Sequence, residues 1–245
     1  QLGDGTTTQN QTFEEIVTSG VVAISAGYKH SAYLKTDGSL WVMGLNSYGQ
    51  LGDGSTTDRL TPYQVEASGV VQMSIGYDTT LYRKTNGSVW GMGRNDSGIL
   101  GDGTSIDRNL SIQIIPSGVI DLSTGNTGQA HALFVKSDGS LWGIGNGANG
   151  RLGNGETVAR YAPTRIHSAG VEKIATGNAH SLFIDVNGSL WAFGKNDNGQ
   201  LGDGSTTDRS NPIQVVSSGV VQLSALNLSS YYSDTNGSLW AFGRN

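Results

Sequence analysis

Three histidines are the residues whose type and spacing could do chemistry, because imidazole serves as a metal ligand and as a general base. His30, His131 and His180 occupy one position in three copies of a repeat, and the two other copies carry Thr79 and Ser229 there. A metal site needs several ligands that converge on one point, whereas equivalent positions of a repeat lie far apart. We therefore expect these histidines to make structural hydrogen bonds.

Two further segments resemble ligand-binding loops in part. Residues 145–150 match the G-x-G-x-x-G pattern, but dinucleotide binding also needs a following helix within a βαβ unit, and a loop-like Arg-Leu-Gly-Asn-Gly stretch follows instead. Residues 196–203 are rich in Asn and Asp, but they lack the spacing and the final glutamate of an EF-hand. The sequence therefore predicts no metal, no cofactor and no enzymatic activity.

An aspartate recurs in a Leu-Gly-Asp-Gly segment, with asparagine in one copy, and we expect it to cap a local turn. The residues at this position are Asp4, Asp53, Asp102, Asn154 and Asp203. An arginine follows six residues later in four copies, and we expect it to form an ion pair or a carbonyl contact within the loop. These arginines are Arg59, Arg108, Arg160 and Arg209, and the first copy has Asn10 instead.

All these residues are positioned by a repeat of about 49 residues, which indicates an array of supersecondary units. Five tryptophans mark the repeat at spacings of 49, 52, 49 and 49 residues, each after an Asp/Asn-Gly-Ser-Leu/Val segment. They are Trp41, Trp90, Trp142, Trp191 and Trp240. Because their positions are equivalent, we expect them to pack in the core.

Each copy reads as four short strands. In the first copy, residues 20–27, 31–36 and 39–43 are β-rich runs, and residues 62–65 begin a fourth strand with a proline suited to a sheet edge. The Asp-Gly or Asn-Gly dipeptide between the second and third runs predicts a type I′ hairpin, in which both residues have positive φ. Four strands per copy predict a propeller blade.

We therefore expect an all-β propeller of about five four-stranded blades, in a single domain over residues 1–245. The alternative is an incomplete or fragment form of a seven-bladed propeller. Trp240–Asn245 and Thr12–Val17 together restore one repeat, so we expect them to pair in one blade of a closed ring. An unclosed array would offer raw edges and could self-assemble.

Composition excludes several classes of protein. The 245 residues include no cysteine, which excludes disulfides and thiolate metal sites. The net charge of -5 argues against a nucleic-acid partner, and no apolar run is long enough for membrane insertion. The Ser-, Thr-, Asn- and Gly-rich composition is typical of secreted and cell-surface bacterial proteins, although the localisation stays open.

The positions where the copies disagree are the best candidates for a binding site. After the first strand of each copy the loops differ, and the third copy has three additional residues. Insertions of this kind usually mark the binding face of a repeat protein, and neutral loop drift is the alternative. The candidate residues are Tyr28, Lys29, Tyr77, Asp78, Asn126, Thr127, Gly128, Gln129, Asn178 and Asn227.

Residues 191–202, Trp-Ala-Phe-Gly-Lys-Asn-Asp-Asn-Gly-Gln-Leu-Gly, together with Ala179-His-Ser-Leu182 before them, resemble the repeat of the regulator of chromosome condensation family. The resemblance extends over the whole chain and implies a β-propeller, usually of seven blades. Family members exchange nucleotide on the GTPase Ran, sense ultraviolet light in plants or inhibit β-lactamases, so the fold carries over and the function does not.

Our leading hypothesis is a non-enzymatic scaffold that presents its rim loops to a protein partner. The alternatives are a cell-surface carbohydrate-binding or adhesive module, and an engineered or amplified array without selected function. Guanine nucleotide exchange is the function that we expect least, because the sequence lacks the basic tail linked with the exchange factor.

Overall fold

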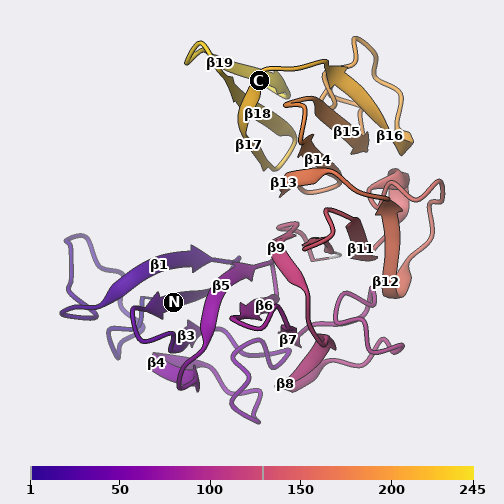
Figure 1. Cartoon of the computed structure of the whole chain (residues 1–245). Coiled ribbons are helices and arrows are strands. Elements are labelled where there is room, and N and C mark those ends of the chain that lie inside the picture. The colour runs from indigo at the N-terminus through magenta and orange to yellow at the C-terminus, as the bar shows by residue number, and fades with distance from the viewer. Residues whose placement is uncertain (1, 129) are drawn as a thin grey trace. The chain divides into compact units, whose positions relative to one another are not determined.

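The protein is built from strands and loops (Figure 1), in a computed structural model that describes residues 2–128 and 130–245. Within these ranges, nineteen strands form five antiparallel sheets, and the remaining element is one short 3-10 helix. Consecutive strands pair in every sheet, as in the blades of a propeller. The predicted all-β class with about five blades is therefore confirmed.

The strand bounds follow the sequence repeat. The first sheet contains β1 (Val21–Ala26), β2 (His30–Lys35), β3 (Leu40–Gly44) and β4 (Arg59–Glu66). The second contains β5 (Val70–Ile75), β6 (Thr79–Lys84), β7 (Val89–Gly93) and β8 (Arg108–Ile115). The third contains β9 (Val119–Thr124), β10 (His131–Lys136), β11 (Leu141–Gly145) and β12 (Arg160–His167), with the helix η1 (Ala148–Gly150) before β12. The fourth contains β13 (Val171–Thr176), β14 (His180–Asp185), β15 (Leu190–Gly194) and β16 (Arg209–Val216).

The fifth sheet has three strands among the described residues, not the four expected. They are β17 (Val220–Leu226), β18 (Ser229–Asp234) and β19 (Leu239–Gly243). Residues 12–17, which we expected to pair in a blade, form no strand in the structure. The expected pairing of this segment with Trp240–Asn245 stays a prediction.

The chain divides into two compact units. One comprises Gln1–Asn95 with Ile106–Ser117 and contains the first two sheets. The other comprises Asp96–Ser105 with Gly118–Asn245 and contains the remaining three. The single domain expected from the sequence stays a prediction.

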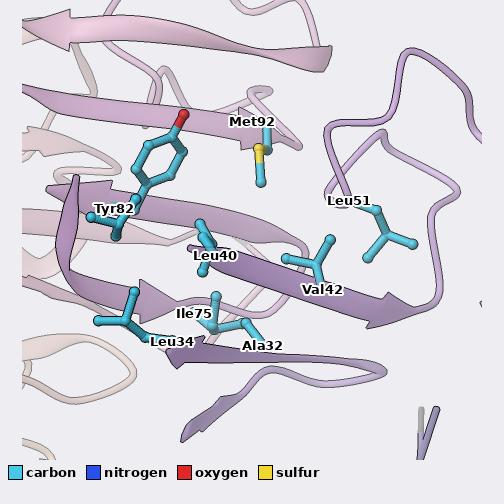
Figure 2. Packing of buried hydrophobic residues seen from close by; sticks show 9 residues of the cluster. Ala32, Leu34, Leu40, Val42, Leu51, Ile75, Tyr82 and Met92 are labelled. Atoms are coloured by element: carbon cyan, nitrogen blue, oxygen red, sulfur yellow. The ribbon is translucent and has the colours of Figure 1, made fainter. Parts of the chain in front are cut away.

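Hydrophobic cores form where one sheet faces the next within a compact unit. In Figure 2, side chains of β2 and β3 lie against side chains of β5, β6 and β7, and Leu51 closes the cluster from the loop before β4. Corresponding positions pack between the third and fourth sheets and between the fourth and fifth. Fully buried members of these clusters include Leu40, Leu51, Tyr82, Met92, Leu133, Leu141, Phe183, Phe193 and Leu190.

The five tryptophans lie at the margin of these cores, and Trp90 and Trp191 pack against them. The prediction of core packing therefore holds only in part, because none of the five is fully buried. The first four are half-buried and Trp240 is 52% exposed. Each indole N–H donates to the adjacent hairpin, at 2.8–3.0 Å to a serine Oγ in the first three sheets and to an aspartate in the last two. The acceptors are Ser39, Ser88, Ser140, Asp185 and Asp234. An indole has a polar edge that needs a partner, which favours this half-buried position over a dry core.

A left-handed glycine closes the hairpin between the second and third strands of every sheet. Gly38 has φ of 77° and donates to the Lys35 carbonyl at 2.9 Å. Among the described non-glycine residues, positive φ occurs at Asn149 and Asn227, so Asp37 does not adopt it. The type I′ prediction is therefore wrong. The Lys35 N–H donates to the Ser39 carbonyl at 3.0 Å, so the closed loop has the three residues 36–38 and places only glycine at positive φ, where a Cβ would be costly.

An asparagine holds the long loop before the fourth strand in the first and fourth sheets. The Asn46 side chain donates to Asp53 Oδ1 at 3.0 Å and to the carbonyls of Ser55 and Thr57 at 3.1 Å, while its oxygen accepts the Leu51 N–H at 2.9 Å. Asn196 repeats these contacts in the fourth sheet.

The predicted ion pairs within this loop are confirmed. Arg59 Nε lies 2.6 Å from Asp53 Oδ2, and Arg209 Nη2 lies 2.7 Å from Asp203 Oδ2.

No helix in the described part of the chain is long and apolar enough to cross a membrane.

Candidate functional site

The nine candidate residues that the structure describes lie in or beside the loops that join the first and second strands of the sheets. Each of the five sheets contributes at least one of these residues. The loops of the first two sheets lie in one compact unit, and the loops of the other three sheets lie in the other.

In the first compact unit, Tyr28 and Tyr77 stack with ring centroids 4.1 Å apart and an interplanar angle of 9°. The Tyr28 N–H donates to the Tyr77 carbonyl at 3.3 Å, which ties the two loops together. Tyr28 is 53% exposed, and the Lys29 ammonium lies 5.0 Å from its ring centroid. Desolvation and the hydrogen bond with Tyr28 raise the pKa of Tyr77.

Asp78 lies beneath this surface. Its side chain is 4% exposed, and its carboxylate lies 3.6 Å from Arg94 Nη1. The Arg94 guanidinium in turn covers the Tyr48 ring at 5.0 Å from the centroid. We call Tyr28, Lys29, Tyr48, Tyr77 and Arg94 the aromatic rim, with Asp78 as its buried anchor.

Sequence reasoning missed Arg94 and Tyr48. A usable signal was present, because the residue after the glycine that ends the third strand also differs between copies. It is Leu45, Arg94, Asn146, Lys195 and Arg244.

In the second compact unit, the loops meet through polar side chains and backbone. The Thr127 hydroxyl donates to the Asn178 carbonyl at 3.4 Å, and the Asn178 N–H donates to the Asn227 carbonyl at 3.0 Å. Asn227 has φ of 51°, a conformation that asparagine tolerates better than most residues. We call Asn126, Thr127, Asn178 and Asn227 the amide rim. Gly128 lies in the adjoining turn, and Gln129 lies outside the described residues.

Arg151 supports the amide rim from below and was also missed by sequence reasoning. It is 8% exposed, and its guanidinium donates to the Asn178 carbonyl at 3.3 Å and to the Ala148 carbonyl at 2.9 Å. Burial lowers the pKa of this guanidinium. The equivalent residues in other copies are Gln50, Ile99 and Gln200, so arginine occurs at this position in the third copy alone.

The three histidines lie below the rims and link neighbouring sheets. Their Nε2 atoms lie 2.8–3.1 Å from hydroxyl oxygens of the next sheet, in the pairs His30–Thr80, His131–Ser181 and His180–Ser230. Each hydroxyl donates onward to a loop carbonyl, those of Gln50, Arg151 and Gln200, at 2.8–2.9 Å. The predicted structural role is confirmed. Burial lowers the pKa of His30 and His180 to about 4.

The remaining loop candidates have structural explanations. The G-x-G-x-x-G segment forms η1 and leads through a loop into β12, without a βαβ unit around it. The Asp203 carboxylate of the acidic loop is occupied by Asn196, Ser205 and Arg209. Within the residues that the structure describes, no group of three or more His, Asp or Glu side chains could hold a metal ion.

The repeat profile of the regulator of chromosome condensation (RCC1) family matches residues 37–82, 138–184 and 187–225. A second profile of the same repeat matches residues 21–50, 70–99 and 171–200. The chain belongs to the RCC1 repeat family. Its resemblance to that family, carried by residues 179–202, is thereby confirmed.

Several solved structures share the fold. Human WBSCR16 is 24% identical with a TM-score of 0.76, and the match covers 87% of this chain and 57% of that one. Prp20p from Saccharomyces cerevisiae is 22% identical with a TM-score of 0.75, and the match covers 91% of this chain and 57% of that one. Yeast RCC1 (Prp20) bound to Kap60 is 16% identical with a TM-score of 0.69 over 91% of this chain and 70% of that one.

This RCC1-repeat chain spans 57% of the length of WBSCR16 and of Prp20p. A search of curated protein sequences finds no match. Together the matches establish the family and a propeller fold of the kind used by protein-interaction scaffolds.

Proposed function

We propose that this RCC1-repeat chain is a non-enzymatic scaffold that binds a protein partner through the aromatic rim. The observation that carries the proposal is the exposed stack of Tyr28 on Tyr77, flanked by Lys29. Tyrosine and arginine are enriched among the residues that dominate protein interfaces. Arg94 and its buried partner Asp78 hold the loops in place, so little ordering entropy is lost on binding.

The relatives are consistent with a role of this kind. Prp20p is described with its binding properties to Gsp1p and histones, and yeast RCC1 has been solved with Kap60. The amide rim extends the proposal to the second compact unit, because asparagine and threonine side chains give an interface adaptable hydrogen bonds.

Affinity capture from the source organism, followed by calorimetry with the purified partner, tests the proposal. The double variant Tyr28→Ala/Tyr77→Ala should weaken binding at least about tenfold, the ratio that corresponds to about 1.4 kcal/mol. Tyr161→Ala is the matched control, because Tyr161 is an exposed tyrosine on β12 and not part of either rim. A partner that binds both variants and the parent equally would refute the aromatic rim as its site.

A carbohydrate-binding or adhesive role is the second candidate, favoured by the exposed Tyr28 ring and the amides of the second rim. A glycan array separates the two, because a saccharide signal that disappears in the double variant would favour it over a protein partner. A nucleotide-release assay with Ran tests guanine nucleotide exchange, which we expect to show no acceleration.

A further inference from the structure

Tyrosine occupies one repeat position in two consecutive copies. Tyr28 and Tyr77 lie in the loop between the first and second strands of the first and second sheets, where the later copies have Asn126, Asn178 and Asn227. Both tyrosines belong to the first compact unit. Because the loops of these two sheets meet within that unit, the repeat brings two phenol rings side by side.

The two rings are in closer contact than most aromatic pairs. Their centroids are 4.1 Å apart and their planes differ by 9°, whereas aromatic pairs usually have centroids roughly 4.5–7 Å apart. The Tyr28 N–H donates to the Tyr77 carbonyl at 3.3 Å, so the two backbones are held together as well. A covalent bond between the rings therefore requires movement of the side chains and no rearrangement of the loops.

This pair is open to oxidation from solution. Tyr28 is 53% exposed, and the Tyr77 hydroxyl is hydrogen-bonded with the Tyr28 side chain. A phenol that loses an electron also loses its hydroxyl proton to water, which leaves a neutral radical. The unpaired electron is shared between the oxygen and the ring carbons, including the two carbons ortho to the oxygen. A radical formed on Tyr28 is thus already in contact with a second phenol.

The other tyrosines have different surroundings. Tyr33 stacks on Trp41 and Tyr232 stacks on Trp240, with centroids 6.0 and 5.9 Å apart, and Tyr82 is wholly buried. Among the ring contacts between residues that the structure describes, the contact of Tyr28 with Tyr77 is the one that joins two tyrosines.

We propose that Tyr28 and Tyr77 are a modification site, at which a one-electron oxidant such as a haem peroxidase with hydrogen peroxide forms a dityrosine crosslink within the chain. Each tyrosine gives one electron to the peroxidase and one proton to water. The two radicals then form a carbon–carbon bond between ring positions ortho to the hydroxyls.

The hydrogen atoms on the two joined carbons move to the oxygens, which restores both phenols. Overall the protein loses two hydrogen atoms, and one molecule of hydrogen peroxide is reduced to two molecules of water. The product is a covalent link between the loops of the first and second sheets. Like a disulfide, it restricts the unfolded chain, so we expect the crosslinked monomer to unfold at a higher urea concentration than the parent.

Mass spectrometry of the purified protein after treatment with a haem peroxidase and hydrogen peroxide tests the proposal. Trypsin releases residues 1–29, in which Tyr28 is the only tyrosine, and residues 60–83, which contain Tyr63, Tyr77 and Tyr82. We expect the monomer to give these two peptides joined, with a mass lower than their sum by two hydrogen atoms. Fragment ions should assign the bond to Tyr77.

Two conservative variants separate the stacked pair from the other tyrosines. Tyr28→Phe retains the ring but lacks the hydroxyl whose proton must leave. It should give at least about tenfold less crosslinked monomer than the parent, because the parent's coupling depends on two phenols held in contact. Tyr161→Phe removes an exposed tyrosine on β12 and should retain the parent's yield.

Dilution and unfolding complete the test. The yield per chain should not change when the protein is diluted, since the reacting rings belong to one molecule. It should fall in urea, because the unfolded chain has no stack. Equal yields from the parent and Tyr28→Phe, or a bond from Tyr28 to Tyr63 or Tyr82, would overturn the proposal. Crosslinks that form only between chains, and that decrease on dilution, would also overturn it.

Discussion

The Nε2 atom of His180 lies 2.8 Å from the Oγ atom of Ser230 on the neighbouring sheet. The Ser230 hydroxyl donates to the Gln200 carbonyl at 2.8 Å, so it must accept a hydrogen bond from the histidine. The proton of the neutral imidazole is therefore on Nε2. The other ring nitrogen is buried and has no hydrogen-bond partner in the structure. Protonation would keep the Nε2 hydrogen bond but would put a charge and an unpaired N–H on the buried Nδ1, which is costly.

We expect the free energy of unfolding to fall as the pH drops from about 6.5 to about 4. In this window the unfolded chain binds a proton at each histidine, whereas burial lowers the pKa of His30 and His180 to about 4 in the folded chain. Burial lowers the pKa of His131 still further. The unfolded state then binds more protons, so each histidine costs up to about 1.4 kcal/mol of stability per pH unit. Urea unfolding at several pH values between these limits measures the slope.

The variant His180→Thr provides the control, because the second sheet has Thr79 at this position. It should reduce the slope by the share of one histidine, and an unchanged slope would contradict the assignment.

The carboxylates affect the free energy of unfolding at lower pH. Although burial opposes its ionisation, hydrogen bonds from Arg209 and Ser205 lower the pKa of Asp203 to about 2. Its contribution is lost only as the pH falls from about 3.8 through about 2.

A second prediction concerns Gly177, whose missing side chain makes room for His180. A Cβ at Gly177 would collide with the Cε1 atom of the imidazole. We expect Gly177→Ala to destabilise the protein by about 1–3 kcal/mol through overpacking. In the His180→Ser background the same change should cost less than about 0.5 kcal/mol, because the clash is gone. The fifth copy supports this coupling, since it carries Leu226 and Ser229 at the two positions. Additive effects in urea unfolding would disprove it.

The repeat made much of this fold predictable. One period of 49 residues specifies strand order, the hairpin glycine and the pairing of Asp53 with Arg59, because these are local features repeated in each copy. The same reasoning placed the tryptophans too deep, since they pack at the margin of the cores. Equivalent positions show that a residue is structural, but they do not show how deeply it lies or where its N–H group points.

The candidate site was predictable in part. Sequence differences between the copies pointed to Tyr28 and Tyr77. The residues that support this tyrosine pair, Arg94 and Tyr48, lie in the loops after the third strands of the same two sheets. Contacts between loops depend on how successive sheets pack, and strand periodicity contains no information about that packing. The burial of Asp78 likewise follows from its ion pair across two loops.

The hairpins give a third prediction that separates two kinds of turn. The Asp138 carboxylate accepts the Ser140 N–H at 2.9 Å, whereas in the fourth sheet Asp185 accepts the corresponding Ser189 N–H at 3.0 Å. We therefore expect Asp138→Ala to cost about 1 kcal/mol, and Asn187→Ala, at the equivalent position, less than about 0.5 kcal/mol. Thermal unfolding of the two variants compares them, and equal losses would contradict this difference in capping.

The fourth prediction concerns Trp142, whose indole N–H donates to Ser140 at 2.8 Å while the Lys136 ammonium lies 4.1 Å from its ring centroid. A variant that retains Trp142 alone, with the other tryptophans changed to Phe, should be partly quenched by acrylamide in the native state. A variant that retains only the more exposed Trp240 should be quenched more, and both less than the unfolded chain. Complete protection of Trp142 would contradict its partial exposure and support the full burial predicted from the sequence.

The fifth prediction concerns Asn196, which is wholly buried at the centre of the loop before β16. Its amide nitrogen lies 2.9 Å from Asp203 Oδ1 and 3.1 Å from the carbonyl oxygens of Ser205 and Thr207. Asn196→Ala should cost about 2–4 kcal/mol, because it leaves buried polar groups without partners.

Asp has the same number of heavy atoms as Asn. Even so, Asn196→Asp should lower the free energy of unfolding at neutral pH more than Asn196→Ala does. The side-chain oxygen of Asn196 accepts the Leu201 N–H at 3.0 Å, so the second carboxylate oxygen would have to face the three oxygens that now receive the amide. A buried charge without a compensating donor is costly, and the nearby Asp203 carboxylate adds repulsion. Asn198→Ala, two residues away, is the control and should cost less than about 0.5 kcal/mol. Urea unfolding of the three variants measures the order, and an Asn196→Asp protein as stable as Asn196→Ala would show that the amide donor is not what holds this loop. A stability deficit relative to the parent that shrinks as the pH falls would identify the missing donor as the cause, because the new carboxyl can donate again once it takes up a proton.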